Sequence, residues 1–147
     1  MALHIALIEP KIPGNTGNIA RLCAATDTSL HLIEPLGFAV DDAAVKRAGL
    51  DYWENVDMWL HPGWRAFREA ISRERCVYFS AKATRPIGEA RFKPNSVLVF
   101  GSETDGMPDR ILEKHPDECF AIPMPSGKVR SLNLATAAGI VLYEALG

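Results

Sequence analysis

The sequence predicts an α/β fold in which a mainly parallel sheet carries helices on both faces. Three observations lead to this prediction. Short apolar runs recur along the chain, as the buried strands of parallel sheets do. Segments with helical spacing of apolar residues, or with helix-start signals, separate these runs. No internal repeat or long linker interrupts this alternation, which is typical of a parallel sheet covered on both sides.

The first third of the chain contains two predicted strands and one predicted helix. Residues 4–8 form an apolar run that stops at a Glu-Pro dipeptide, and residues 30–33 form a second run that stops in the same way. Between them, Asn15 or Thr16 can cap a helix, because their side-chain oxygens can accept hydrogen bonds from the free amides of the first turn. The apolar face of this helix follows the i, i+3, i+4, i+7 spacing and consists of Ile19, Leu22, Cys23 and Thr26.

The middle of the chain continues the alternation of helices and strands. A short helix is expected over residues 41–49, with acidic residues at its start and basic residues near its end, as the helix dipole prefers. A second helix is expected over residues 63–72. Strands are expected at residues 76–79 and 97–100, and the second of these leads into a loop that begins and ends with glycine.

The last third predicts a short helix, a strand and a long apolar helix. Pro108 fits the first turn of the short helix, and residues 119–122 form the strand. Ser131 stands where the N-cap of the last helix is expected, so its hydroxyl and the free amides behind it predict a polar, anion-tolerant pocket. That helix, residues 132–146, is apolar almost all round. We therefore expect it to be buried on both sides, with a second subunit covering one of them.

Length and composition predict one soluble domain that spans residues 1–147. Hydrophobic residues make up 48% of the chain and charged residues 23%, as in ordinary globular proteins. The formal net charge of −2 lacks the basic signature of many nucleic-acid binders, so a local patch would have to hold any nucleic acid. The sequence shows no signal peptide and no uncharged run of transmembrane length, so we expect no membrane partner.

The cysteines predict a reducing environment. Cys23, Cys76 and Cys119 are odd in number, far apart, and set in apolar patterns. Buried free thiols are favoured over a disulfide, and we therefore expect a cytoplasmic protein. The histidines show no metal-ligand spacing with these cysteines, so no metal site is predicted.

Three loops beyond the carboxyl ends of predicted strands carry the candidate site, since ligands bind there in parallel sheets. They cover residues 13–21, 100–106 and 122–134, and they are rich in glycine and polar side chains. The first loop lacks the G-x-G-x-x-G and phosphate-loop patterns, which disfavours a dinucleotide dehydrogenase. Taken singly, each loop has a simpler interpretation: a turn with a helix cap, a surface carboxylate at Glu103, or solvated cations.

Taken together, the three loops resemble the sequence motifs of SpoU-type RNA 2′-O-methyltransferases of the SPOUT superfamily. The matching motifs are N-T-G-N-I-A-R, V-F-G-S-E-T-D-G, and I-P-M with S-L-N-L and I-V-L-Y-E. The match runs from Ile5 to Glu144. More narrowly, the segments E-P-x-x-P-G-N-T-G-N-I-A-R-L-C, L-I-E-P-L-G-F and R-A-G-L-D-Y-W resemble small members that methylate the wobble ribose of certain leucine tRNAs, at cytidine or 5-carboxymethylaminomethyluridine 34.

The resemblance implies a C-terminal deep trefoil knot that holds S-adenosyl-L-methionine as cofactor. It also implies a homodimer, with each active site completed across the interface, and the anticodon stem-loop of a tRNA as the RNA partner. Metal is not required for this chemistry. The positions that match the family's cofactor-binding residues are Phe79, Gly101, Ile122, Ser131 and Leu132.

The resemblance further implies which polar residues serve the reaction. Arg21 matches the motif arginine that activates or orients the ribose 2′-hydroxyl or its neighbouring phosphate. Because arginine holds its proton so tightly, we assign it first to orientation and electrostatics. Glu103 is expected to orient Arg21 as a carboxylate–guanidinium pair. The other matching polar positions are Asn15, Ser131 and Asn133.

Several assignments stay open at this stage. Tyr143 on the last helix fits an interface, an RNA contact or simple packing. The methyltransferase could act on ribosomal RNA or on another tRNA position, and a non-catalytic RNA-binding module is a more distant alternative. The cations available for RNA contact are Lys11, Arg21, Lys46, Arg47, Lys82, Arg85, Lys128 and Arg130.

Overall fold

A seven-stranded sheet forms the centre of the molecule, and every neighbouring pair of its strands is parallel. The computed structural model describes residues 2–40, 43 and 55–147. The strand order is β3-β2-β1-β6-β4-β7-β5. This confirms the predicted α/β class with a parallel sheet. The strands are β1 (His4–Ile8), β2 (Ser29–Ile33), β3 (Met58–His61), β4 (Cys76–Phe79), β5 (Arg85–Pro86), β6 (Val97–Phe100) and β7 (Cys119–Ala121).

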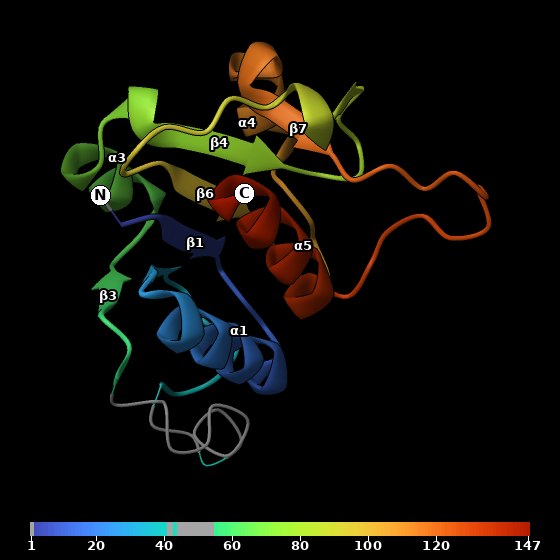
Figure 1. Cartoon of the computed structure of the whole chain (residues 1–147). Coiled ribbons are helices and arrows are strands. Elements are labelled where there is room, and N and C mark those ends of the chain that lie inside the picture. Colours follow the sequence, from blue (N-terminus) through green and yellow to red (C-terminus); the bar gives the residue numbers. More distant parts are fainter. Residues whose placement is uncertain (1, 41–42, 44–54) are drawn as a thin grey trace.

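Helices cover both faces of the sheet, as predicted. Figure 1 shows α1 (Pro13–Thr26) and α5 (Leu134–Leu146) side by side in front of the sheet. Side chains that alternate along the strands divide the core into two clusters, one against α1 and α5 and one against α3 and α4. The other helical segments among the described residues are α3 (Trp64–Ala70), α4 (Asp109–Lys114) and the short 3₁₀ turns Arg73–Arg75, Ile87–Glu89 and Pro116–Glu118.

The predicted strands agree closely with the observed ones. β1, β4 and β6 have the expected bounds, while β2 begins one residue earlier and β7 ends one residue earlier than expected. The prediction missed β3 and β5. β3 lies at the sheet edge with Trp59 and Leu60 exposed, so its sequence lacks a buried-strand pattern. β5 contains only two residues.

Both predicted N-caps were wrong. α1 begins at Pro13, which suits the first helical position because its φ is pre-set and it has no amide to leave unpaired. Asn15 and Thr16 therefore lie within the first turn. α5 begins at Leu134, and its cap is Asn133, so Ser131 lies before the helix. The segment R-A-G-L-D-Y-W lies outside the described residues. The expected helix over residues 41–49 also lies outside them, except for residue 43.

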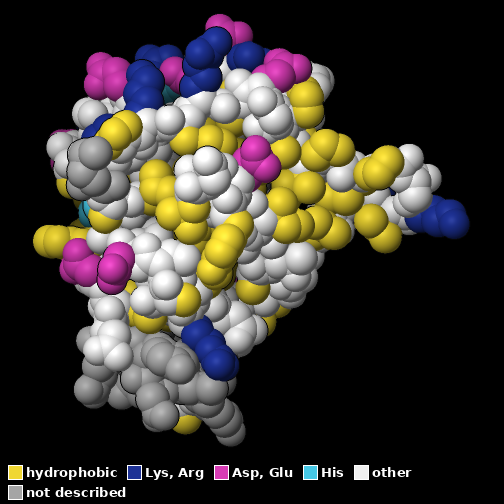
Figure 2. All heavy atoms as spheres, in the orientation of Figure 1, with side chains coloured by type: hydrophobic (Ala, Val, Ile, Leu, Met, Phe, Trp, Pro, Cys, Tyr) yellow, Lys and Arg dark blue, Asp and Glu magenta, His cyan; other side chains and the backbone are white. Residues whose placement is uncertain are grey.

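The terminal helix buries one face within the chain and exposes apolar side chains on another. Ala138, Val141 and Leu142 are buried, whereas Ile140 and Tyr143 are exposed. In Figure 2, hydrophobic side chains form a band over this side of the molecule and along the projecting segment between β7 and α5. One side of α5 is thus buried within the chain, and the expected cover of the other side by a second subunit stays a prediction. In the part of the chain that the structure describes, no helix has the length and apolar character to cross a membrane.

Pro108 stands one position before its predicted place. α4 begins at Asp109, and Pro108 is its N-cap residue.

The three cysteines are buried and free, as predicted, because each belongs to an apolar layer of the core.

Candidate functional site

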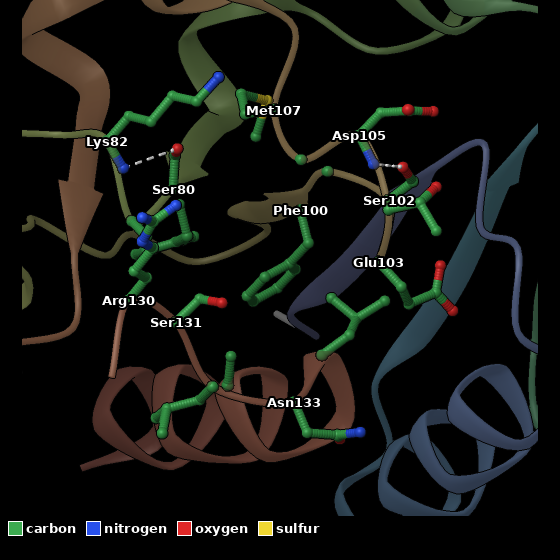
Figure 3. A pocket seen from close by; sticks show the side chains of 18 of the residues that line it. Ser80, Lys82, Phe100, Ser102, Glu103, Asp105, Met107, Arg130, Ser131 and Asn133 are labelled. Carbon is green, nitrogen blue, oxygen red and sulfur yellow. Dashed lines mark hydrogen bonds between the residues drawn. The ribbon is translucent and has the colours of Figure 1, made fainter. Parts of the chain in front are cut away.

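A cavity of about 1010 Å³ opens at the carboxyl edge of the sheet. β4, β6 and β7 lie next to one another in the sheet, so the loops that follow them meet at one edge. The start of α1 and the segment that leads into α5 complete the wall. Figure 3 shows side chains from these segments facing the same space.

Eight of the nine predicted site residues line this cavity, and Arg21 does not. All five residues predicted to hold a cofactor belong to the lining. Arg21 instead lies exposed on α1, two turns from the helix start. Its expected pairing with Glu103 stays a prediction. The eight lining residues are Asn15, Phe79, Gly101, Glu103, Ile122, Ser131, Leu132 and Asn133.

The loop after β6 is closed on itself. The amide of Gly106 donates to the carbonyl of Ser102 at 3.0 Å, and the Ser102 hydroxyl accepts from the amide of Asp105 at 3.0 Å. Gly106 has a φ of 67°, which favours glycine. A Cβ at position 101 would lie 2.2 Å from the Gly106 carbonyl carbon and from the Met107 nitrogen. Only glycine therefore allows this turn to fold back against the end of β6.

Glu103 anchors the segment that leads into α1. Its carboxylate oxygens accept from the backbone amides of Lys11, at 2.8 Å, and Ile12, at 2.9 Å. The second oxygen also accepts from Nδ2 of Asn15 at 3.3 Å. A carboxylate at this place is also favoured by the positive end of the α1 dipole. The structure thus shows that Glu103 positions the start of α1, whereas the sequence predicted only that it orients Arg21.

Asn133 ties the third loop to the first. Its Oδ1 accepts from the amides of Ala135, at 2.9 Å, and Thr136, at 3.2 Å, and so caps α5. Its Nδ2 donates to Oδ1 of Asn15 at 3.1 Å. Because Asn15 also donates to Glu103, one chain of hydrogen bonds joins all three loops. We name the residues Glu103, Asn15 and Asn133 the loop clamp.

The cavity is apolar in its middle and charged at two ends. Lys82 and Arg130 lie near Ser80 and Ser131 on one side, and Glu103 lies on the other with the loop after β6 (Figure 3). Sequence reasoning missed several lining residues, although most of them adjoin a recognised motif. The apolar members of this group are Ile12, Ala81, Phe100, Met107, Met124, Leu134 and Ala137.

The cavity offers what a bent nucleoside with a charged tail needs. Apolar side chains from three loops can cover a flat base, and main-chain groups of the same loops can meet its polar edge. The volume lies at the upper end of the range for small-molecule sites. Among the residues that the structure describes, no group of three or more His, Cys, Asp or Glu side chains is arranged to hold a metal ion.

Comparison with known proteins places the chain in a family. The model of the SpoU rRNA Methylase family matches residues 2–143. A tRNA (cytidine(34)-2′-O)-methyltransferase from Burkholderia ambifaria is 46% identical over 97% of this chain and 92% of its own length.

Two solved structures share the fold. One, described as "Structural insights into the 2-OH methylation of C/U34 on tRNA", is 47% identical with a TM-score of 0.91 and covers 99% of this chain and 94% of its own. The second is the SpoU methyltransferase AviRb from Streptomyces viridochromogenes in complex with AdoMet. It is 24% identical with a TM-score of 0.86, and the match covers 99% of this chain and 57% of that one.

Proposed function

Because this chain belongs to the SpoU rRNA methylase family, we propose that it methylates the ribose 2′-hydroxyl of nucleotide 34 in tRNA. The observation that carries the proposal is the cavity on which eight predicted site residues converge. The Burkholderia relative bears the name of this activity, and a solved structure at 47% identity is described in the same terms. We extend the proposal to leucine tRNAs with cytidine or 5-carboxymethylaminomethyluridine at this position.

S-adenosylmethionine is the proposed methyl donor, and the lining of the cavity fits it. Ile122 and Leu132 provide apolar cover for an adenine ring, and Gly101 allows the backbone to approach it closely. A solved neighbour of the same fold holds this cofactor. When bound, the cofactor supplies a methyl group on a positively charged sulfur, so the transfer needs alignment and removal of the hydroxyl proton, without a metal.

The chain's own residues would align the ribose and stabilise the charge that develops. The loop clamp holds the three loops at fixed spacing, which keeps the two reactants in line. The Ser131 hydroxyl lines the cavity and can accept or donate a hydrogen bond there. We assign Arg21 to orientation of the 2′-hydroxyl or the adjacent phosphate, since a guanidinium stays protonated and binds such oxygens in two places.

A homodimer would reconcile the role of Arg21 with its position. Arg21 lies outside the lining of its own chain's cavity, on the exposed side of a helix packed beside α5. α5 exposes Ile140, Tyr143 and Leu146, which a second copy could cover. We infer that the two copies associate over this side and that Arg21 of one copy serves the cavity of the other.

Two further parts of the proposal concern the path of the chain and its compartment. α5 follows β7 in the chain yet packs on β6 and α1. Because β4 lies between β7 and β6 in the sheet, the chain crosses back over the sheet after β7. This return supports a trefoil knot.

Buried free thiols at Cys23, Cys76 and Cys119 support a cytoplasmic location, where tRNA is modified.

Methyl transfer from labelled S-adenosylmethionine to leucine tRNA transcripts tests the function. We expect labelling of the transcript with a normal ribose at position 34 and none of a matched transcript with 2′-deoxyribose there. Equal labelling of both would move the activity to another nucleotide. Absence of labelling in both, with intact cofactor binding by calorimetry, would contradict RNA methylation of this substrate.

Arg21→Ala tests the residue assigned to orientation. The rate of methyl transfer should fall on the order of 100-fold, because a misplaced hydroxyl loses most of the benefit of alignment. Cofactor affinity should stay unchanged, since Arg21 is assigned to the hydroxyl or phosphate of the RNA and not to the cofactor. Arg65→Ala, which removes another exposed arginine on α3, serves as the control and should retain full activity. Full activity of the Arg21 variant would remove Arg21 from the mechanism.

A further inference from the structure

Four charged side chains line the cavity, and they are separated by sign. Lys82 and Arg130 come from the loop after β4 and from the segment before α5. Figure 3 shows them together on one side, with Ser80 between them. Glu103 and Asp105 belong to the loop after β6. The cavity therefore has a basic end and an acidic end.

The two cations are available to an incoming anion. Lys82 Nζ lies 3.2 Å from Asp109 Oδ1, but the two side chains are 59% and 76% exposed. Such an exposed pair contributes little and exchanges readily for a stronger partner. Arg130 is exposed, and within the described residues its guanidinium makes no hydrogen bond or ion pair. A free guanidinium beside a weakly paired ammonium is a receptive site for an oxyanion.

Glu103 at the acidic end does not compete for these cations. Both oxygens of Glu103 are engaged by the amides of Lys11 and Ile12, with Asn15 as a third donor. Between the two ends the cavity is lined by apolar side chains such as that of Phe100 (Figure 3), and this part of the cavity suits a base. The basic end is thus left for a group other than the base.

We propose that Lys82 and Arg130 form a phosphate subsite that holds the RNA backbone beside the ribose to be methylated. This inference rests on the proposed function and names how the same site grips its substrate. Arginine can bind two phosphate oxygens at once, and lysine adds a second positive charge. Because the chain carries a net charge of −2, affinity for RNA must come from such local cations.

A double variant and a matched control test the subsite. Lys82→Ala with Arg130→Ala removes one lysine and one arginine from the cavity. Arg91→Ala with Lys93→Ala removes the same charges from exposed positions that line a separate hollow. Steady-state methylation of the leucine tRNA transcript at several salt concentrations, cofactor affinity by calorimetry and thermal unfolding are measured for both.

The cavity variant should raise the KM for tRNA on the order of tenfold, with unchanged kcat and unchanged cofactor affinity. The slope of log kcat/KM against log salt should flatten by about 1.4, since each lost contact to single-stranded RNA removes about 0.7. The control variant should match the wild type in all these quantities. Thermal unfolding should be the same for all three proteins, because every changed side chain is exposed.

Two results would overturn the subsite. One is an unchanged KM and salt slope in the cavity variant. The other is a tenfold loss of cofactor affinity, which would mean that the cations bind the carboxylate of the cofactor. If the wild type transfers no methyl group, the proposed function fails on its own. Binding of a fluorescent anticodon stem-loop then tests the subsite separately, and equal affinity and salt dependence of both double variants would overturn it.

Discussion

At the scale of single residues, Asn133 has two structural functions in one side chain. Its oxygen caps α5, and its nitrogen donates to Asn15 and so completes the loop clamp. The two functions can be separated, because aspartate keeps an acceptor for the helix amides but has no donor for Asn15. A carboxylate at this place is also compatible with the helix dipole.

Asn133→Ala should lower the free energy of unfolding by about 1 to 2 kcal/mol, since it removes the cap and the link to Asn15. Asn133→Asp should cost less, because only the link is lost. Urea unfolding of both variants and the wild type at pH 7 measures the difference. Equal destabilisation by the two substitutions would show that capping contributes little here.

At the scale of secondary-structure elements, three neighbouring strands are joined by a line of histidines. Nδ1 of His4 on β1 lies 2.9 Å from Nε2 of His31 on β2, and Nδ1 of His31 lies 2.9 Å from Nε2 of His61 on β3. Phe67 packs edge-on against His31 and His61. Each contact needs one donor and one acceptor nitrogen. The three histidines can therefore take up one added proton, on an outer nitrogen of His4 or His61. A second added proton would place two N–H donors opposite each other in one of the contacts.

The histidine line predicts a loss of stability in mild acid. The pKa of His31 is lowered to about 3, mainly by burial and in part by the nearby His4, His61 and Arg75, while Asp57 opposes the shift. Burial likewise lowers the pKa of His4 and of His61. Because the unfolded chain binds the proton more tightly, the free energy of unfolding should fall below pH 6.5.

For His31 alone, the loss amounts to about 1.4 kcal/mol per pH unit, or about 2 kcal/mol between pH 6.5 and pH 5.0. Urea unfolding at these two values measures it. His31→Phe should show a smaller difference, and His115, whose pKa burial also lowers, contributes equally to both proteins. The same pH dependence in variant and wild type would show that His31 does not titrate in this range.

At the scale of the whole molecule, the exposed apolar side of α5 predicts a dimer that is needed for activity. Ile140→Glu places a charge on this side, where Ile140 is 41% exposed. Desolvating that charge in an interface is costly, so sedimentation equilibrium should show a monomer, and methyl transfer should fall with it. Leu60→Glu makes a similar change at a 47% exposed residue of β3 and should leave the dimer intact. A dimeric, active Ile140 variant would place the interface elsewhere.

Most of the sheet could be predicted from local patterns, whereas eight of the residues that line the cavity were named from the resemblance to a known family. Buried strands such as β4 and β6 have short apolar runs, and the loops that follow parallel strands meet at one edge. The partners of Glu103 could not be predicted, since it bonds to Lys11 across 92 positions of the chain. The edge strand β3 escaped prediction because its exposed side chains carry no pattern of burial.

Local patterns predicted the fold class and the three loops, because periodicity and motif spacing depend on neighbouring positions. The resemblance to a known family added the residues expected to line the cavity. The three-dimensional arrangement was needed to show that Asn133 rather than Ser131 caps α5 and that Glu103 holds the start of α1. It also separated the cations from the carboxylates in the cavity and left Arg21 outside it. These outcomes depend on which distant groups meet in space, and hydrogen bonds across 88 and 118 positions leave no local trace in the sequence.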